Sequence, residues 1–378
     1  MKILHISKYY FPYVGGTEQV ARDICSSFND DSIIEQKVIC FNDSNKSVID
    51  DVGGIQIIRC ACFAKLFSQP LSYVYYKKLK NVLDTFKPDL IIFHYPNPLI
   101  SSILLKLLNK KIKLVLYWHL DITKQKYIGK LFHRQNIELL ERANKIVATS
   151  PNYIDGSNYL NKYKEKCVVI PNCVSINYDN ISKELKERAQ EIKDKYKNKF
   201  ICFTVGRHIP YKGFEYLIEA SNYLDNDCVV LIGGKGPLTN KLKEKAKNSK
   251  NVELIGFVSG EDLIAYYLAC DVITFSSITK NEAFGISLAE GMAFGKPAIT
   301  FTIPGSGVNY VNLNGITGIE CSNKNYKEYA DAINLLKTNS ELKQKYGVNA
   351  KERVKALFTF EKFKENINNL IETIRLLG

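Results

Sequence analysis

Three features of the sequence predict an α/β fold with two domains, each built on a mostly parallel sheet. Short apolar strands, such as residues 3–7 and 90–94, alternate with helical segments of ten or more residues, which is typical of a parallel sheet covered on both faces. The 378 residues correspond to about two domains rather than one core. A highly charged helix predicted at 182–196 separates two such series, so we place the start of the second domain near Asn198.

The overall composition is that of an ordinary soluble protein. Hydrophobic residues make up 46% and charged residues 24% of the chain. No run approaches the ~18 apolar residues of a membrane-spanning helix, and the first residues lack the pattern of a signal peptide. The ten cysteines are scattered without a C-x-x-C pair. We therefore expect a cytosolic protein without disulfides or a structural metal.

The net charge of +13 suggests an anionic partner. The alternative is that the high lysine content reflects the base composition of the genome and has no functional meaning. Between Ile103 and Arg134 eight basic residues and one acid, Asp121, are interleaved with apolar and aromatic residues. Such a mixture suits an anionic membrane surface, which attracts each basic residue by ~1 kcal/mol. The alternative is a surface helix followed by a solvated loop.

In the first domain, two strand ends carry residues suited to binding. After the first strand, Gly15 and Gly16 open a predicted helix with Thr17 as its N-cap, so that backbone amides would face an anion. The strand at 113–118 ends in His119, and the carboxyl ends of parallel strands are where ligand-binding residues collect. His94, at another strand end, is a weaker candidate. The alternatives are a plain turn and structural histidines.

In the second domain, a strand delivers Gly206 and Arg207, and Lys212 with Gly213 opens a helix five residues later. Two cations beside helix amides suit a diphosphate and neutralise its charge without a divalent metal. The alternative is that both side chains are simply solvated at the surface.

A tight turn follows the next strand at Gly233, Gly234 and Gly236. This turn is not G-x-G-x-x-G, and the first strand lacks a ribose-binding acid, which argues against a nicotinamide enzyme.

The most informative stretch runs from Asn281 to Ile299 and carries Glu282 and Glu290. We expect Glu282 in a loop and Glu290 about two turns into a helix, which places the carboxylates roughly 12 Å apart. That separation suits the two ends of an extended polyhydroxyl ligand better than a direct acid/base pair. Solvent-facing glutamates on an amphipathic helix are the alternative.

This stretch resembles the E-x7-E signature of retaining glycosyltransferases of the GT-B architecture, in particular the large family 4. The G-R-x(4)-K-G pattern of the same family is matched in full at 206–213, and the resemblance runs through nearly the whole chain. It implies two Rossmann-like domains with parallel sheets facing across a cleft. Residues 1–175 would bind the acceptor, 198–358 the nucleotide sugar, and 359–378 would form a helix packing back towards the first domain.

The resemblance also implies roles for the site residues. His119, Glu282, Arg207 and Lys212 would be catalytic, with the diphosphate held by Arg207 and Lys212, the ribose by Glu290, and the sugar by Glu282 and His119. The remaining donor-binding residues implied by the resemblance are Gly234, Phe257, Phe284, Gly285 and Ile286. Gly15 and Gly16 would form the acceptor and phosphate loop.

The chain departs from the family pattern in two places. Cys173 stands where members usually carry glycine, and residues 302–320 differ from the commonest family form, which often has a Gly-Gly and a glutamate in this region. The second departure leaves the donor sugar open.

Together these features predict a retaining glycosyltransferase that moves a hexose or N-acetylhexosamine from a UDP- or GDP-sugar, with no metal or other cofactor. The preferred acceptor is a lipid-diphosphate-linked glycan of a bacterial surface polysaccharide, at the cytoplasmic face of the inner membrane. A GT-B epimerase or phosphorylase is an alternative, because fold does not fix chemistry. A basic membrane- or polyanion-binding protein is another, and no nucleic-acid partner is expected, because such binding leaves the glutamate and arginine-lysine motifs unexplained.

Overall fold

The computed structural model describes residues 1–13, 15–29, 31–66, 69–121, 132–176, 178–258 and 260–377. Its contacts divide the chain into two compact units. The first unit consists of Met1–Thr149, Ser157–Ile170 and Phe363–Gly378, and the second of Ser150–Gly156 and Pro171–Lys362. Each unit is described by itself.

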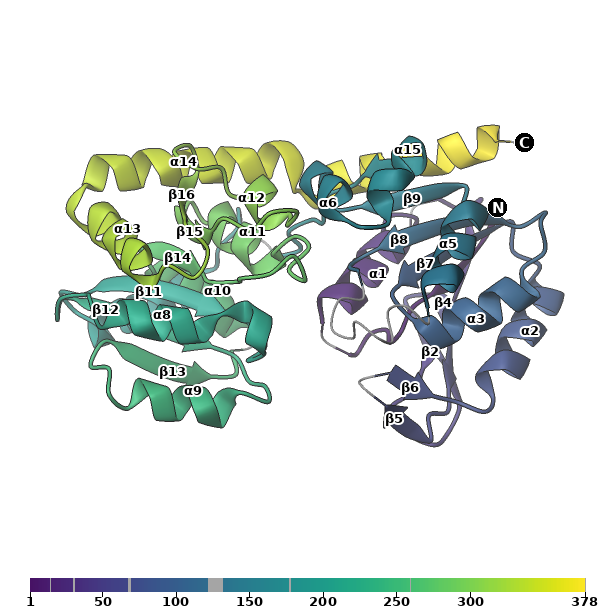
Figure 1. The fold of residues 1–378 in the computed structure, drawn as a ribbon, viewed down its shortest axis with the longest axis horizontal. Helices are drawn as coiled ribbons and strands as arrows, with labels where there is room; N and C mark the ends of the chain where they lie inside the picture. The colour runs from purple at the N-terminus through teal and green to yellow at the C-terminus, as the bar shows by residue number, and fades with distance from the viewer. Residues whose placement is uncertain are drawn as a thin grey trace. The chain divides into compact units, whose positions relative to one another are not determined.

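The first unit is built on an eight-stranded sheet in the order β10-β9-β8-β7-β1-β2-β4-β3 (Figure 1). Every neighbouring pair is parallel except β3 and β4, which form an antiparallel edge. The strands are β1 (Lys2–Ile6), β2 (Glu35–Phe41), β3 (Val48–Val52), β4 (Ile55–Cys60), β7 (Leu90–Tyr95), β8 (Lys113–Trp118), β9 (Lys145–Ala148) and β10 (Cys167–Val169). The predicted parallel sheet is thus confirmed.

Helices connect these strands, and a separate two-stranded hairpin precedes α2. The hairpin consists of β5 (Ala64–Leu66) and β6 (Gln69–Leu71). The helical segments are α1 (Gly16–Ser26), α2 (Tyr75–Phe86), α3 (Pro98–Leu107), α5 (His133–Arg142), η1 (Leu160–Lys162), η2 (Lys164–Lys166) and the last helix, α15 (Phe360–Leu376).

Two of these helices show how the sequence pattern fixes local structure. α2 buries Leu79, Val82, Leu83 and Phe86, which recur with the spacing of one helical face, and ends at Lys87 in the left-handed conformation. α15 likewise buries an apolar stripe, Phe363, Ile367, Leu370, Ile371 and Ile374. From Phe363 on, α15 belongs to the first unit, and Nζ of Lys113 donates to the carbonyl of Leu377 at 2.8 Å.

The second unit contains a six-stranded, fully parallel sheet in the order β13-β12-β11-β14-β15-β16. The strands are β11 (Phe200–Val205), β12 (Cys228–Gly233), β13 (Val252–Gly256), β14 (Val272–Phe275), β15 (Ala298–Phe301) and β16 (Gly318–Cys321). Strand and helix alternate along the chain, so this unit is Rossmann-like as predicted. Its helical segments are α6 (Pro151–Gly156), α7 (Lys183–Lys195), η3 (Pro210–Lys212), α8 (Phe214–Ser221), α9 (Thr239–Ala246), α10 (Gly260–Ala269), α11 (Ile286–Ala293), α12 (Val308–Val311), α13 (Tyr326–Thr338) and α14 (Ser340–Leu357).

Two helices that precede Asn198, the predicted start of the second domain, belong to this unit: α6 and α7. The short helix α6 is held by backbone packing, since a Cβ built on Gly156 would lie 2.2 Å from Cα of Gly305. The charged helix α7 is anchored by one buried residue, Ala189, which packs with Ala265 and Ala269 of α10. α7 is therefore part of the second unit rather than a separate linker.

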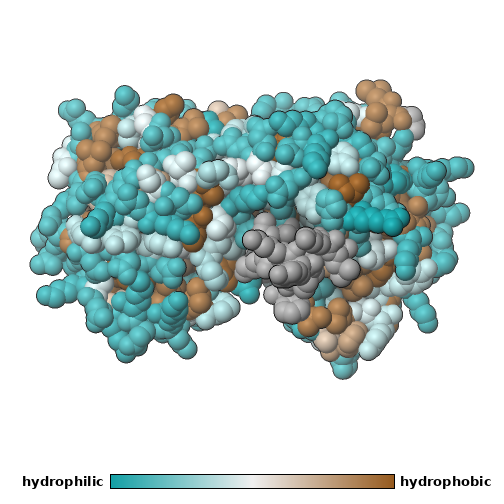
Figure 2. Space-filling view, viewed as in Figure 1, coloured by the Kyte–Doolittle hydropathy of each residue, from teal (hydrophilic) through white to brown (hydrophobic). Residues whose placement is uncertain are grey.

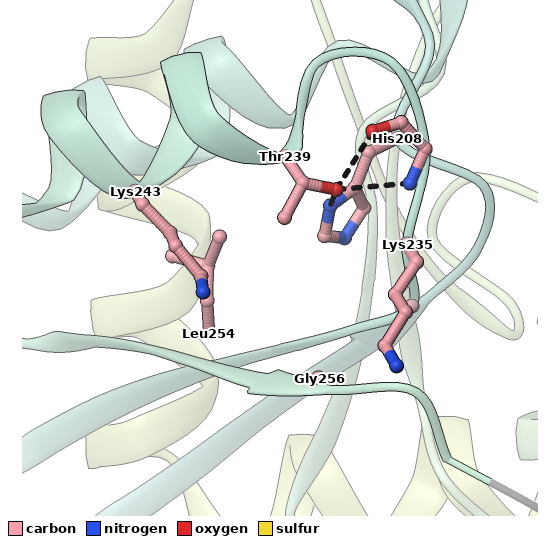
Figure 3. A pocket seen from close by; sticks show the side chains of 8 residues that line it. His208, Lys235, Thr239, Lys243, Leu254 and Gly256 are labelled. Carbon is pink, nitrogen blue, oxygen red and sulfur yellow. Dashed lines mark hydrogen bonds between the residues drawn. The ribbon is translucent and has the colours of Figure 1, made fainter.

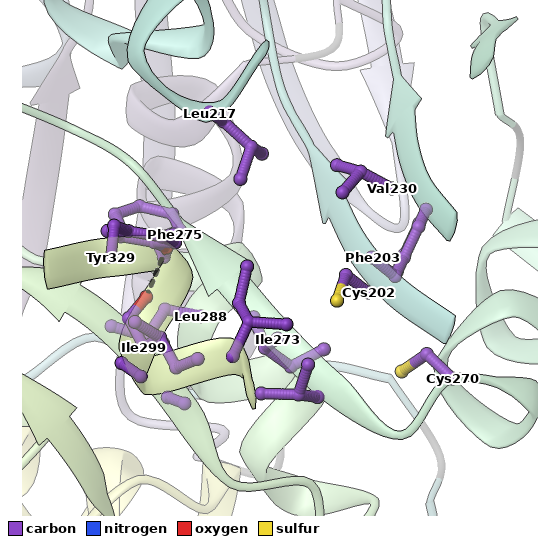
Figure 4. Close-up of a cluster of buried hydrophobic side chains, with 14 of the residues drawn as sticks. Cys202, Phe203, Leu217, Val230, Cys270, Ile273, Phe275, Leu288, Ile299 and Tyr329 are labelled. Atoms are coloured by element: carbon purple, nitrogen blue, oxygen red, sulfur yellow. Dashed lines mark hydrogen bonds between the residues drawn. The ribbon is translucent and has the colours of Figure 1, made fainter. Parts of the chain in front are cut away.

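The core of the second unit surrounds its central strands (Figure 4). Cys202 and Phe203 of β11 lie among side chains from β12, β14 and β15, and the hydroxyl of Tyr329 donates to the carbonyl of Ile299 at 2.6 Å. No disulfide joins the ten cysteines, all of which lie in the described residues. A buried thiol such as that of Cys202 therefore acts as a small apolar side chain.

Candidate functional site

In the second unit, the predicted site residues follow the carboxyl ends of parallel strands. Arg207 comes two residues after β11, Gly234 directly after β12, Phe257 directly after β13, and Glu282 in the segment between β14 and α11. Parallel strands bring these ends to one edge of the sheet, which is where α/β proteins bind ligands.

The closest charged contact at this edge joins Lys212 and Glu282. Nζ of Lys212 lies 2.5 Å from Oε2 of Glu282, and the two side chains are only 13% and 12% exposed. Ser277 donates a further hydrogen bond to the same oxygen at 3.0 Å, and the ammonium group also lies over the ring of Phe275, 4.8 Å from its centroid. The family resemblance predicted that Lys212 binds the donor diphosphate and Glu282 the sugar. The structure shows that Glu282 also fixes the position of Lys212.

Arg207 differs from Lys212 in being exposed, and within the described residues it forms no hydrogen bond or ion pair. Its position is indicated by Tyr211. Burial raises the pKa of Tyr211, the carboxylate of Glu282 raises it further, and the guanidinium of Arg207 lowers it. Both charges are therefore close enough to act on one phenol, and the exposed guanidinium of Arg207 is available to a ligand anion.

Glycines allow the loops at this edge to pack backbone against backbone. A Cβ built on Gly234 would lie 2.0 Å from the carbonyl oxygen of Gly206, and one on Gly213 would lie 2.2 Å from that of Ser276. Both glycines have positive φ, +117° and +65°. The family resemblance implied that Gly234 binds the donor. The structure shows that contact between loops also requires glycine at 234 and at 213.

The expected depth of Glu290 in its helix is wrong. α11 begins only at Ile286, because Gly285, with φ of +94°, forms its N-cap. Glu290 is therefore the fifth helical residue, little more than one turn in. Oε2 of Glu290 lies 2.9 Å from the hydroxyl of Tyr267, which holds the carboxylate at the start of the helix.

The two residues before Ile286 also have structural roles. The side chain of Phe284 is 2% exposed and packs edge-on against Phe358, with ring centroids 5.3 Å apart. Only the backbone of Phe284 is thus left for a donor, because its ring belongs to the core.

A pocket of about 310 Å³ lies beside Gly234 (Figure 3). It is lined by His208, Gly234, Lys235, Gly236, Thr239, Lys243, Leu254 and Gly256. Of these residues, the sequence singled out Gly234 and Gly236. Phe257, directly after this lining, is 63% exposed, an unusual state for a phenylalanine and one that leaves its ring face for a planar ligand.

Within the pocket, Thr239 orders both the glycine turn and His208. Its hydroxyl accepts from the amide of Gly236 at 2.9 Å, donates to the carbonyl of Gly236 at 2.8 Å, and lies 3.0 Å from Nδ1 of His208. The hydroxyl proton is used by Gly236, so Nδ1 of His208 is the donor to Thr239. A threonine three residues after a glycine at a helix start was the available sequence signal.

In the first unit, His94 and His119 form a buried pair at the ends of β7 and β8. Nδ1 of His94 lies 3.0 Å from Nε2 of His119, and the side chains are 1% and 7% exposed. Burial lowers the pKa of His119 to about 3 and lowers that of His94 well below its usual value. Both rings are therefore neutral near pH 7. Two residues after His119, the carboxylate of Asp121 accepts hydrogen bonds from Nε1 of Trp118 at 2.9 Å and from the hydroxyl of Ser157 at 2.8 Å.

The glycine loop of the first unit differs from the expectation in its cap. Gly15, not Thr17, is the N-cap of α1, and its φ of −176° is ordinary extended backbone. A Cβ built on Gly15 would lie 2.3 Å from Oε2 of Glu18. The carboxylate of Glu18 thus lies at the helix N-terminus, where a substrate anion was expected. Gly16 is the first helical residue.

The basic region at 103–134 is only partly described, since residues 122–131 lie outside the described residues. In the described part, Ile103 and Leu104 are buried in α3, and Lys113 binds the end of α15. Within the described chain no helix is long and apolar enough to span a membrane. Nor do three or more His, Cys, Asp or Glu side chains gather there in a metal-binding arrangement.

Comparison with solved structures identifies the fold. The Anabaena protein HepE, solved in complex with UDP and glucose, matches with a TM-score of 0.78 and 17% identity, over 98% of this chain and 99% of its own. Sucrose-phosphate synthase of Thermosynechococcus elongatus matches with a TM-score of 0.81 and 18% identity over 100% of both chains. The two parallel α/β units thus have the GT-B glycosyltransferase fold.

Sequence comparison identifies the family. Residues 14–178 match the family described as Glycosyltransferase Family 4, and residues 186–353 match Glycosyl transferases group 1. The D-rhamnosyltransferase WbpZ of Pseudomonas aeruginosa is 31% identical over 95% of this chain and 92% of its own, and the O-antigen chain mannosyltransferase C of Escherichia coli is 29% identical over 99% of both. The chain belongs to glycosyltransferase family 4, as the sequence motifs predicted.

Proposed function

We propose that this glycosyltransferase moves a hexose or N-acetylhexosamine from a UDP- or GDP-linked donor to a lipid-diphosphate-linked glycan during assembly of a bacterial surface polysaccharide, O-antigen or capsule. The relatives named as an O-antigen mannosyltransferase and a D-rhamnosyltransferase favour mannose or a related sugar. The observation that carries the proposal is the largely buried Lys212–Glu282 pair beside exposed Arg207, because it presents cations and a carboxylate suited to a sugar at one sheet edge.

In the proposed reaction, the bond between the anomeric carbon and the donor phosphate breaks as a bond to the acceptor hydroxyl forms on the same face. Arg207 and Lys212 stabilise the negative charge that develops on the departing diphosphate. The acceptor proton goes to that diphosphate, so no separate base is needed, and the anomeric configuration is retained. Glu282 and His119 would bind the sugar, and Glu290 the ribose. With two cations in place, the reaction needs no metal.

Thermal stabilisation by a panel of UDP-, GDP- and ADP-sugars, with and without magnesium, tests the donor site. A ligand that binds only the folded state raises the melting temperature as its concentration exceeds the dissociation constant. We expect a shift with one nucleotide family that is unchanged by magnesium or EDTA. A shift that requires magnesium contradicts metal independence, and no shift with any nucleotide sugar contradicts the donor site.

Product analysis by NMR then tests the chemistry. A retained anomeric configuration in a product that contains the acceptor supports the proposed transfer. Turnover without an acceptor would indicate an epimerase, and a requirement for inorganic phosphate would indicate a phosphorylase.

We also propose a peripheral position on the cytoplasmic face of the inner membrane. Nucleotide sugars are made in the cytosol and a lipid-linked acceptor is held at the bilayer, so an enzyme that joins them works at that boundary. Cell fractionation tests this placement: the protein should sediment with the membranes and be released from them by a high-salt wash. Recovery of all the protein in the soluble fraction before any salt wash would contradict it.

A further inference from the structure

Three large apolar side chains gather on the surface around the hairpin β5–β6. Phe63, Leu66 and Tyr73 are 47%, 56% and 80% exposed. The rings of Phe63 and Tyr73 stack with centroids 3.9 Å apart and planes within 3°. Figure 2 shows a group of brown, apolar residues at the lower right, over this hairpin. A soluble protein rarely exposes such residues together unless they contact something.

The chain segment that contains the hairpin is basic. Residues 53–83 contain five lysines and arginines and no aspartate or glutamate. Lys65 lies on β5 and Lys77 in the first turn of α2, next to exposed Tyr76, and both lysines are exposed. Exposed aromatic rings beside exposed lysines match the interface of an anionic bilayer, where rings sit at headgroup depth and cations bind phosphates.

The hairpin adjoins the loop that leads to Gly15. Nζ of Lys65 lies 5.4 Å from the ring centroid of Tyr9, and the ring of Tyr9 stacks on that of Tyr13 at 4.8 Å. In the same loop, Phe11 is 40% exposed. A group bound at the hairpin is therefore beside the loop that the family resemblance assigns to the acceptor.

We propose that the docking surface, defined as Phe63, Lys65, Leu66, Tyr73 and Lys77, seats the first unit on an anionic membrane and receives the lipid-linked acceptor there. The proposal rests on the lipid-linked acceptor of the proposed function. It favours a bilayer over a second copy of this chain, because self-association would bring lysine against lysine with no acid between them. The contact of residues 103–134 with a membrane stays a separate prediction, because residues 122–131 lie outside the described residues.

Vesicle sedimentation of the full chain tests the docking surface. Wild-type protein should bind phosphatidylglycerol vesicles, bind phosphatidylcholine vesicles weakly, and lose binding in high salt. The triple variant Phe63→Ser, Leu66→Ser, Tyr73→Ser should reduce partitioning by about tenfold or more, and the pair Lys65→Glu, Lys77→Glu should abolish the preference for anionic lipid.

A matched control carries Ile33→Ser and Val348→Ser, which remove apolar residues that are 73% and 56% exposed elsewhere. The control should bind vesicles like wild type. Equal binding by the triple variant and wild type, or no binding by wild type, overturns the proposal.

Two further measurements separate this proposal from the proposed function. The triple variant should keep its thermal shift with the nucleotide sugar and its activity on a short water-soluble acceptor, and lose activity only on the lipid-linked acceptor. Equal loss on both acceptors with unchanged vesicle binding would assign the aromatic pair to glycan binding and overturn the docking proposal. A dimer in wild type that the triple variant dissociates would assign it to a second copy, which also overturns it. Failure of the nucleotide shift in wild type would instead contradict the donor site.

Discussion

Nδ1 of His94 lies 3.0 Å from Nε2 of His119, and both rings are buried and neutral, so one ring donates to the other. The other nitrogen of His94, Nε2, is buried without a hydrogen-bond partner among the described residues. An unpaired buried N–H is rarer than an unpaired acceptor, which favours the proton of His94 on Nδ1. His119 then accepts through Nε2 and carries its own proton on Nδ1, so it meets a substrate oxygen as a hydrogen-bond donor rather than a base.

We predict that ¹⁵N NMR of histidine side chains will show His119 as the neutral Nδ1–H tautomer near pH 6, assigned by loss of its signals in His119→Asn. His94→Phe keeps a stacked ring but removes the donor, so His119 should shift towards the Nε2–H tautomer and transfer should fall about tenfold. His94→Asn places an amide near the original Nδ1 and should restore much of the activity. An Nε2–H tautomer of His119 in wild type would contradict this assignment.

We also predict that acidification destabilises the first unit through its buried histidines. Burial lowers the pKa of His5 to about 4 and of His119 to about 3, so below pH ~6.5 the unfolded chain binds protons that the folded chain does not. Stability from this source is complete above pH ~6.5 and falls as the pH drops, by at most about 1.4 kcal/mol per pH unit for each histidine.

Urea unfolding at pH 7.5, 6.5 and 5.5 measures this loss. His5→Asn should flatten the pH dependence, whereas His133→Asn, which changes an exposed histidine, should leave it as in wild type. Identical slopes for His5→Asn and wild type would show that His5 is not the titrating group.

The contact between Lys212 and Glu282 predicts coupled losses. Lys212→Met and Glu282→Gln each leave a largely buried charge unpaired, so each should lower the free energy of unfolding by about 2–3 kcal/mol and reduce transfer about 100-fold or more. The double variant should be less destabilised than the sum of the two, by about 1–2 kcal/mol, because no lone charge remains.

The matched control is Lys195→Met, which breaks the exposed salt bridge between Lys195 and Glu253, 2.8 Å long. It should cost at most about 1 kcal/mol and leave transfer unchanged. Strict additivity of Lys212→Met and Glu282→Gln, or normal activity in all three site variants, would remove this pair from the proposed site.

The strands and the positions of Arg207, Lys212 and Glu282 were predictable because their signals are local: an apolar run, then glycine, a cation or an acid. The contact between Lys212 and Glu282 was not, because it depends on β11 lying beside β14, and sequence does not supply that order. His208 and Thr239 were missed for the same reason, since their contact joins the ends of β11 and β12.

The starts of two helices, α1 and α11, differ from the prediction, and in each a single glycine is the N-cap. Gly285, with φ of +94°, delays α11 and puts Glu290 nearer the helix start than its spacing suggested. α1 begins at Gly16 with Gly15 as its N-cap, so Thr17 is already the second helical residue and cannot be the cap.

The packing of Gly234 against Gly206 gives a last prediction. Gly234→Ala places a methyl group 2.0 Å from a backbone carbonyl and strains a φ of +117°, so it should lower the free energy of unfolding by more than about 2 kcal/mol and weaken nucleotide-sugar binding about tenfold. Gly315→Ala is the matched control, because Gly315 also has positive φ, +73°, but has nothing within 4 Å of the added methyl group. It should cost only about 1 kcal/mol and leave binding unchanged. Urea unfolding and thermal shifts with the nucleotide sugar measure both effects. Equal losses in the two variants would mean that backbone strain alone, and not contact between the loops that follow β11 and β12, makes glycine necessary at position 234.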